Sequence, residues 1–345
     1  MNILSTIFLL NTSLLDHILF VLNKYFYHFS YIDKIYDPTS RKAISRWTLL
    51  LPSAGCSWAK TKGGGCHMCG FARGASSITN GKTLSSDNLL RYFKINANHV
   101  ANNKPDNISI YNGGSFFNDL EICLDGQIKI FREISYHPTI KNVFVESRPE
   151  YINERHIKNL MELLGHKKLM VGIGLECESD EIRNNSINKG FSKEKYEMAV
   201  QTLKRLGVAV TTYVFIKPLF LSEKAAIEEA VETVKYAFSS GSDEVALEAA
   251  FVQKGTLMEK YYKMNKFSPP WLWSIIEVVK NTGHLGVVRL GGFSDFPEPV
   301  ALPRNCPNCT EKIKSTFSDY KTNLDLDIFS LLKCDCKNEW EKIIR

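Results

Sequence analysis

The chain has 345 residues, of which 44% are hydrophobic and 23% charged, the balance of a globular protein with room for one catalytic domain and a small appendage. It contains no low-complexity tract and no repeat of fixed period, which excludes fibrous and solenoid architectures. The net charge of +6 is compatible with a polyanionic partner and equally with an ordinary solvated surface.

Residues 3–22 are rich in Ile, Leu and Phe and at first sight resemble a signal peptide or a membrane anchor. Asp16 lies inside this run, however, and an Asp costs ~2.5–3.5 kcal/mol at the centre of a membrane. No Lys or Arg precedes the run, and no small-residue cleavage site follows it. We therefore expect no membrane association. We interpret residues 1–45 as a helical N-terminal extension, or as the product of a start codon placed too far upstream.

After residue 46, short apolar runs alternate with amphipathic segments of helical length. The runs are 47–51, 108–111, 142–145, 169–175, 208–216 and 244–250, with a seventh candidate at 285–290. Ser85, Ser192 and Ser222 are placed as helix N-caps, and Pro149 opens a helix that Gly165 ends. A strand followed by a helix, six times over, predicts parallel β/α units. The pattern alone does not separate a barrel from a doubly wound sheet, but both folds bind ligands at the C-terminal ends of their strands.

The nine cysteines form two tight groups, and only Cys123 and Cys177 stand apart, as ordinary buried cysteines. Closely spaced cysteines in a chain without a clear export signal favour metal binding in a reducing compartment. We therefore expect a cytoplasmic location.

The first group, Cys56, Cys66 and Cys69, lies on the loop after the first predicted strand. Three thiolates on a [4Fe–4S] cube leave one iron without a protein ligand, where another molecule can bind. A structural zinc ion would need a fourth ligand, and His67 is poorly placed because it lies inside the C-x-x-C pair. Three consecutive glycines at 63–65 let the loop fold tightly around a bulky group. The loop therefore predicts an iron–sulfur cluster.

The cysteine loop resembles that of radical S-adenosylmethionine (SAM) enzymes, although nine residues separate Cys56 from Cys66 instead of the usual three. The longer gap resembles the branch that contains the Elongator catalytic subunit. Residues 46–345 more closely resemble the radical SAM subunit of archaeosine synthase, through Gly-Cys-Ser-Trp, Gly-Cys-His-Met-Cys-Gly, Glu-Ser-Arg-Pro-Glu-Tyr-Ile, Ile-Asn-Lys-Gly-Phe-Ser and Pro-Pro-Trp-Leu-Trp-Ser. The resemblance implies an α/β fold, a partial (β/α)6 TIM-type barrel of the radical SAM kind, over residues 46–296.

The glycines and polar residues that follow successive strands are the expected binding residues for SAM. They are Gly113, Gly114, Ser115, Glu146, Arg148, Glu176 and Lys217. The resemblance implies that the Gly-Gly backbone meets the amino group of SAM and that Glu176 binds its ribose. Structural alternatives remain for each, including a paired buried carboxylate for Glu176 and a surface lysine for Lys217.

The second cysteine group lies in residues 297–345, a small C-terminal metal-binding segment that follows a proline-rich linker. Four thiolates match a closed tetrahedral site for a structural Zn²⁺, and a second iron–sulfur cluster is the alternative. The four are Cys306, Cys309, Cys334 and Cys336. A helix at about 310–320 lies between the two pairs.

The resemblance implies an enzyme that uses a [4Fe–4S] cluster and SAM to cleave a C–N bond of a lysine-modified 7-deazaguanine in tRNA, which gives archaeosine. It implies tRNA as substrate, the lysine-attaching subunit of archaeosine synthase as partner, and a one-electron donor such as ferredoxin or flavodoxin. One alternative is another radical SAM modification of tRNA, by methylthiolation or carboxymethylation. A second is a non-catalytic RNA-binding protein with zinc at both sites. The sequence assigns no residue to proton transfer.

Overall fold

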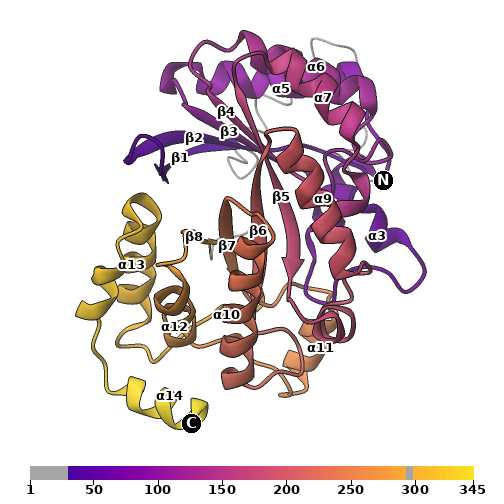
Figure 1. The fold of residues 1–345 in the computed structure, drawn as a ribbon. Helices are drawn as coiled ribbons and strands as arrows, with labels where there is room; N and C mark the ends of the chain where they lie inside the picture. Colours follow the sequence, from indigo (N-terminus) through magenta and orange to yellow (C-terminus); the bar gives the residue numbers. More distant parts are fainter. Residues whose placement is uncertain (1–29, 293–297) are drawn as a thin grey trace.

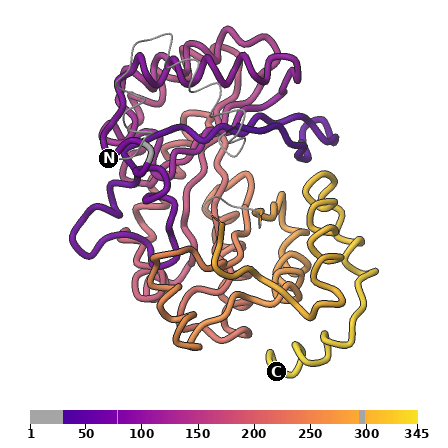
Figure 2. The backbone as a smooth tube through the Cα atoms, turned by 180° about the vertical axis from the view of Figure 1, so that it is seen from behind, coloured from indigo at the N-terminus to yellow at the C-terminus, as the bar shows by residue number. Residues whose placement is uncertain are grey.

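The computed structural model describes residues 30–292 and 298–345, in which one eight-stranded sheet curls into a half-barrel (Figures 1 and 2). Strands β2 to β8 are parallel and neighbour one another in chain order, and β1 pairs antiparallel with β2. The strands are β1 (Ser30–Asp37), β2 (Lys42–Leu50), β3 (Asn107–Tyr111), β4 (Asn142–Glu146), β5 (Lys168–Glu176), β6 (Ala209–Ile216), β7 (Glu244–Ala249) and β8 (Val287–Leu290).

Helices follow the strands and cover the outer face of the sheet (Figure 1). The longer ones are α4 (Phe71–Thr79), α5 (Ser86–Val100), α6 (Leu124–Tyr136), α7 (Glu154–Leu164), α9 (Lys193–Arg205), α10 (Glu223–Ser239), α12 (Leu272–Thr282), α13 (Thr310–Asn323) and α14 (Cys336–Ile344). The shorter ones are α3 (Ser57–Lys60), α8 (Asp180–Ile182) and α11 (Leu257–Lys263). Because strand order follows chain order without a reversal, the structure is a half-barrel and not a doubly wound sheet. The predicted α/β barrel class is confirmed.

Residues 30–45 do not form the helix that we expected of the N-terminal extension. They form β1 and the start of β2, joined by a turn in which the Asp37 carboxylate accepts a hydrogen bond from the Ser40 N–H (2.9 Å). Asp33 on β1 lies opposite Arg46 on β2, and the two form an ion pair at 2.7 Å. This partner lies 13 residues further along the chain, so the local pattern of residues 30–37 does not reveal it. Residues 1–29, including the apolar run, lie outside the described residues.

None of the helices in residues 30–292 and 298–345 has the length and apolar character needed to cross a membrane.

Three apolar clusters of buried residues support the sheet, and the smallest includes Phe215 of β6 and Met258 of α11. The first packs the outer faces of β2 to β6 against α5, α6, α7 and α9. The second joins β6, β7 and β8 to α10 and α12, and it includes Ile313 and Phe317 of α13 and Trp340 of α14. The proline-rich linker is held as well, because Val252 and Ala301 form an isolated β-bridge. The C-terminal segment therefore shares the core of the barrel.

The expected helix starts agree in part with the structure. Ser85 and Ser222 accept hydrogen bonds from backbone N–H groups in the first turns of α5 and α10, as N-caps do. Ser192 occupies the N-cap position of α9 without such a bond. Pro149 opens only a short 3-10 turn, after which Asn153 caps α7.

We expect Ser222→Ala to lower the free energy of unfolding by about 1 kcal/mol, because the Ala225 N–H loses its acceptor. Ser192→Ala is the matched control, since the Ser192 hydroxyl bonds to the exposed side chain of Glu194 and caps no backbone N–H. Urea denaturation measures both variants, and an equal effect of the two would contradict the assignment of the cap.

Candidate active site

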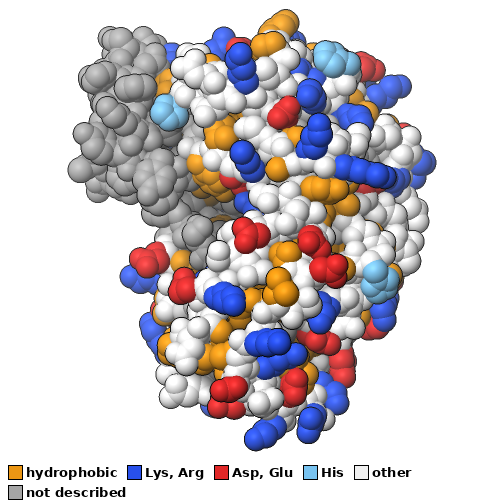
Figure 3. All heavy atoms as spheres, turned by 90° about the vertical axis from the view of Figure 1, so that its left-hand side faces the viewer, with side chains coloured by type: hydrophobic (Ala, Val, Ile, Leu, Met, Phe, Trp, Pro, Cys, Tyr) orange, Lys and Arg blue, Asp and Glu red, His pale blue; other side chains and the backbone are white. Residues whose placement is uncertain are grey.

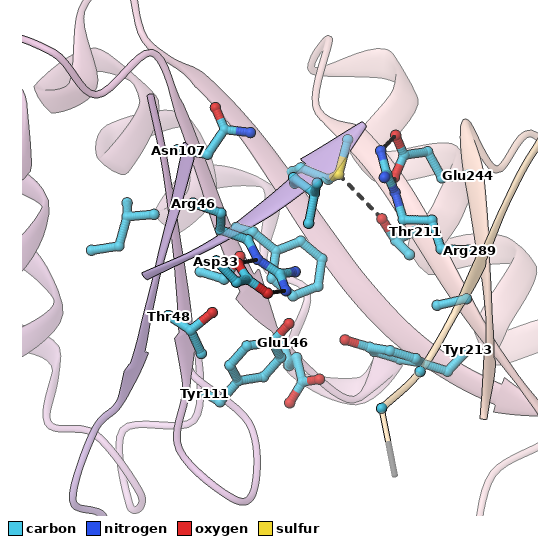
Figure 4. Close-up of a pocket in the computed structure, with 18 of the residues that line it drawn as sticks. Asp33, Arg46, Thr48, Asn107, Tyr111, Glu146, Thr211, Tyr213, Glu244 and Arg289 are labelled. Atoms are coloured by element: carbon cyan, nitrogen blue, oxygen red, sulfur yellow. Dashed lines mark hydrogen bonds and ion pairs between the residues drawn. The ribbon is translucent and has the colours of Figure 1, made fainter. Parts of the chain in front are cut away.

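A cavity of about 1510 Å³ runs along the inside of the half-barrel. Cys66 and Cys69 line it at the C-terminal ends of the strands, and Arg46 and Glu244 line it towards the N-terminal ends (Figure 4). The catalytic end expected for a β/α barrel therefore opens directly onto the first cysteine group.

The three cysteines of the first group lie on the segment between β2 and α4. Cys56 immediately precedes α3. Cys69 is close enough to both Cys56 and Cys66 for the charges of their thiolates to interact. Their sulfurs are not gathered at the distances that suit a single ion, whereas those of the C-terminal group are. A cube-shaped cluster binds each thiolate to a different iron and therefore separates its ligands more widely than one ion does. The arrangement fits a [4Fe–4S] cluster better than zinc.

A buried carboxylate fixes this loop to the neighbouring loop after β3. Glu121 accepts hydrogen bonds from the backbone N–H of Ser57 (2.8 Å) and of Ser115 (2.6 Å), and from the amide of Asn118 (2.9 Å). A Cβ atom on Gly114 would collide with the Glu121 carboxylate, so the close approach requires glycine there. Glu121 thereby sets the position of the cysteine loop against the expected SAM-binding loop.

The glycine-rich part of the cysteine loop is clamped from the other side by Asn188. Its amide donates to the carbonyls of Gly63 (3.0 Å) and Gly65 (2.9 Å), and its own carbonyl accepts from the Trp58 indole (2.9 Å). His67 is held in the same way, since its N–H donates to the Ile187 carbonyl (2.8 Å). The imidazole Nδ1 of His67 lies 3.2 Å from the Ser186 carbonyl, so this ring nitrogen also has a protein partner.

Arg148 stacks between two aromatic rings beside the cysteines. Its guanidinium carbon lies 5.3 Å from the ring centroids of both Trp58 and Phe191, and its Nε donates to Glu150 (2.6 Å). Its Nη2 is buried without a hydrogen-bond partner. The pKa values of Cys56 and Cys66 are raised by burial and lowered by the charge of Arg148, so this cation favours the thiolates.

Glu176 and Lys189 form a buried ion pair at 2.6 Å that also faces the cysteines. Glu176 has a φ of 69° at an irregularity in the pairing of β5 with β6, which turns its side chain out of the strand's regular alternation. Burial raises the pKa of the Cys66 thiol to about 12, and the Lys189 ammonium is the strongest opposing influence. Lys189 is thus the cation best placed to support a thiolate on Cys66.

Polar groups without partners line the same end of the cavity. Both polar atoms of the Asn112 amide and the Nε2 of Gln253 are buried and unpaired, while the Gln253 oxygen accepts from the Gly70 N–H. Because an unpaired buried polar atom costs about 1–3 kcal/mol, these groups suit a polar ligand that would satisfy them. Gly113 lines the cavity next to Asn112, where the expected SAM-binding motif places it.

Glu146 lies deeper in the cavity, at the end of β4. Its carboxyl is hydrogen-bonded to Tyr213 from β6, and Tyr111 from β3 reaches towards it (Figure 4). Burial raises the pKa of Glu146 to about 7, against the opposing effects of the Tyr213 hydroxyl and the Lys189 charge. The side chain therefore faces the interior of the barrel, below the cysteine loop.

Lys217 does not line the cavity. Its ammonium pairs with the Glu223 carboxylate, which also accepts from the Ser274 hydroxyl (2.6 Å) and the Trp271 N–H (2.8 Å). The Lys217 ammonium is therefore held in a buried network outside the cavity. Lys217 has a φ of 68°, so its backbone leaves the strand direction at this position and directs the side chain towards α10.

The C-terminal cysteines form a compact group, in which all four sulfurs lie within 4.8 Å of one another. Cys306 lies 3.7 Å from Cys309 and 3.4 Å from Cys334, and Cys309 lies 3.6 Å from Cys336. The predicted four-cysteine group is therefore assembled in the fold.

No family model matches the chain. The chain is 32% identical over 303 residues to archaeosine synthase subunit beta of Methanosarcina acetivorans, an alignment that covers 86% of this chain and 84% of the relative. The chain belongs to the archaeosine synthase subunit beta family. Archaeosine synthase subunit beta of Thermococcus kodakarensis is 27% identical, over 89% of this chain and 94% of that protein.

Among solved structures, methylornithine synthase shares the fold, with a TM-score of 0.50 at 11% identity. The match covers 83% of this chain and 74% of that one. The resemblance to archaeosine synthase inferred from the motifs is confirmed by the relatives, and the half-barrel is a fold found in a known enzyme structure.

The sequence did not single out Glu121, Asn112, Tyr213 or Lys189 as functional. Lys189 lies in the Ile-Asn-Lys-Gly-Phe-Ser segment that supports the family resemblance, so the sequence marked this segment but assigned no role to the lysine. Glu121 lies late in the loop after β3, away from the strand end, and belongs to no motif. Its contact with Ser57 spans 64 positions, and only the fold reveals it.

We expect Glu121→Gln to destabilise the cysteine loop by about 1–3 kcal/mol, because an amide nitrogen replaces one acceptor of the Ser57 and Ser115 N–H groups. Urea denaturation and hydrogen exchange of the Ser57 amide measure the effect. Glu162→Gln on the exposed surface of α7 makes the same chemical change and should stay within about 0.5 kcal/mol. Equal effects of the two would contradict the role of Glu121.

The raised pKa of Glu146 predicts a pH-dependent effect of Glu146→Gln. The folded chain holds the Glu146 proton more tightly than the unfolded chain, so ionisation costs folding free energy as the pH rises from 4.5 to about 7. The stability of the variant relative to the natural chain should therefore increase across that range. Denaturation at a series of pH values checks this, with Glu162→Gln as the control. A difference that stays flat or falls would show that the carboxyl is not buried as described.

Proposed function

We propose that this chain is a radical SAM enzyme of tRNA modification and that Cys56, Cys66 and Cys69 hold its [4Fe–4S] cluster. The observation that carries the proposal is that these three thiols lie together at the catalytic end of a half-barrel, where Cys66 and Cys69 line a large cavity. When bound, a cluster with one open iron supplies the electron that cleaves SAM and so gives access to hydrogen abstraction. The membership of the archaeosine synthase subunit beta family supports the same reading.

The residues around the cysteines have distinct tasks in this proposal. Lys189 and Arg148 place positive charge near the thiolates, and Glu121 holds the cysteine loop in register with the Gly113 loop. Asn112 and Gln253 offer unpaired amide groups to the polar parts of SAM. Glu176, fixed by Lys189, is placed to accept hydrogen bonds from ribose hydroxyls.

We infer the reaction from the family to which the chain belongs. The substrate is a tRNA with a lysine-bearing 7-deazaguanine, and hydrogen abstraction from the lysine side chain leads to cleavage of its C–N bond and to archaeosine. A cavity of about 1510 Å³ exceeds the size of an ordinary small-molecule site, which is about 300–1,000 Å³, so it has room for SAM and a flipped-out nucleoside. The designation of the relatives as subunit beta supports a partner subunit, which attaches the lysine. A one-electron donor such as ferredoxin or flavodoxin would reduce the cluster.

The surface charge adds little support for tRNA binding. On the described part of the face shown in Figure 3, Lys and Arg side chains alternate with Asp and Glu and form no continuous basic area. On α13, the ammonium groups of Lys314 and Lys321 each have a carboxylate partner already, Glu311 and Asp33 respectively. Recognition of the substrate is therefore assigned to the cavity and the partner.

Replacement of Cys56, Cys66 and Cys69 by Ala should remove the iron-dependent absorbance of the anaerobically reconstituted protein and its reductive cleavage of SAM. Cys123→Ala, a half-buried cysteine outside both groups, should retain both properties. Visible absorption, iron analysis and detection of 5′-deoxyadenosine measure the outcome. Iron binding that survives the triple replacement would overturn the proposal.

The reaction is tested separately by nucleoside analysis of tRNA from cells that lack the gene. Loss of archaeosine with accumulation of the lysine adduct supports C–N cleavage. A different missing nucleoside would point instead to the methylthiolation or carboxymethylation class.

A further inference from the structure

We propose that Cys306, Cys309, Cys334 and Cys336 bind a single Zn²⁺ whose role is to hold α13 as a strap across the open side of the half-barrel, between β1 and β8. The proposal rests on the geometry of the four sulfurs and on the contacts of α13, and it is independent of the reaction proposed above.

The spacing of the sulfurs identifies the kind of metal centre. A tetrahedral Zn²⁺ with Zn–S bonds of about 2.3 Å places its sulfurs about 3.8 Å apart. The three close sulfur pairs lie 3.4–3.7 Å apart, which matches that edge and is far longer than the S–S bond of a disulfide, at about 2.05 Å. A four-iron cube would separate its ligands more widely, so the structure favours one ion over a second cluster.

The surroundings of the sulfurs are those of a built site. The indole N–H of Trp273, on α12, points at the Cys336 sulfur at 3.4 Å, the type of outer hydrogen bond that orients a metal ligand. Cys309 and Cys336 are buried, and Cys306 and Cys334 are half-exposed. The ion would join the start of α13, the start of α14 and, through Trp273, the barrel helix α12.

The other end of α13 reaches both edges of the sheet. The Tyr320 hydroxyl donates to the Val288 carbonyl of β8 (2.8 Å), and the next residue, Lys321, pairs with Asp33 of β1. Phe317 is buried one turn earlier, in the core cluster shared with β7 and β8. One helix therefore contacts the first and the last strand of the sheet.

These contacts matter because β1 and β8 are not hydrogen-bonded neighbours in the sheet. The Arg289 side chain of β8 connects the two strands, because it donates to the Tyr36 carbonyl of β1 (3.0 Å). The same guanidinium forms a two-bond ion pair with Glu244 of β7 (2.6 Å for each bond). A helix anchored at one end by a metal and at the other by both edge strands limits the separation of these strands. The cavity between them would keep its width only while the anchor is intact.

The test uses the full chain and measures metal and strand protection together. Zinc analysis should find about one Zn²⁺ per chain, and X-ray absorption at the zinc edge should find four sulfurs at about 2.3 Å. Cys306→Ser combined with Cys334→Ser should lose this zinc, and hydrogen exchange should become faster at 30–37 and 287–290. Cys123→Ser, the matched control, should keep the zinc and the protection. Zinc absent from the natural chain, iron held by these four cysteines, or zinc loss with unchanged exchange in both strands would each overturn the proposal.

Two further variants keep the test decisive if the double cysteine variant does not fold. Trp273→Phe removes the N–H donor of Cys336 and should weaken zinc binding about 10–100-fold in competition with a chelator. Trp340→Phe, whose indole donates to Ser274 and not to sulfur, should leave zinc binding unchanged. Lys321→Gln should keep the zinc and yet lose protection at 30–37, and retained protection would overturn the strap. A chain without iron at Cys56 would leave all these zinc results intact, so failure of the proposed function is distinguishable.

Discussion

Within residues 30–292 and 298–345, no ladder of backbone hydrogen bonds joins the two edge strands of the sheet, β1 and β8. In a closed barrel every strand has two neighbours, and the interior is filled by side chains. Here the unclosed side leaves a cavity that runs from the cysteine loop to the opposite end of the strands. The cavity therefore results from the incomplete barrel, and the chain must secure the exposed edges in another way. Arg289 and α13 are the described elements that do so.

At the catalytic end, buried charged groups hold the loops around the cysteines in position. Glu121 binds two loops at once, Lys189 pairs with Glu176, and Arg148 is stacked between rings from two different loops. Burying such groups is costly unless every one is paired, and here each has a partner of opposite charge or a set of N–H donors. The result is a rigid frame around three thiols that must each point at a common centre.

Much of the fold was predictable from the sequence because its signals are local. The strands from 47 to 290 are short apolar runs, and the caps of α5 and α10 are single serines with a clear spacing. The choice between a barrel and a doubly wound sheet was not predictable, because it depends on the order of the strands and not on any one strand.

Within the site, the cysteines and the glycines of the β3 loop were recognisable as motifs. The place of the Lys217 side chain was not predictable, because its position after a strand is typical of a ligand contact while its left-handed backbone turns the ammonium towards Glu223. Glu121 and the Asp33–Arg46 hairpin pair were missed because their partners lie far along the chain.

The contacts that hold the cysteine loop affect how the protein would respond to oxidation by air. The carbonyls of Gly63 and Gly65 are held by Asn188, and the N–H of Ser57 is held by Glu121, so protein contacts fix both ends of the glycine-rich stretch of the loop. This differs from small zinc domains, whose fold exists only with the metal. Under the proposed function, iron and sulfide would enter a loop that these contacts already shape, and a chain that lost the cluster to oxidation would need reduction and refilling but no refolding. Faster hydrogen exchange of the Ser57 and Trp58 amides after removal of the iron would contradict this view.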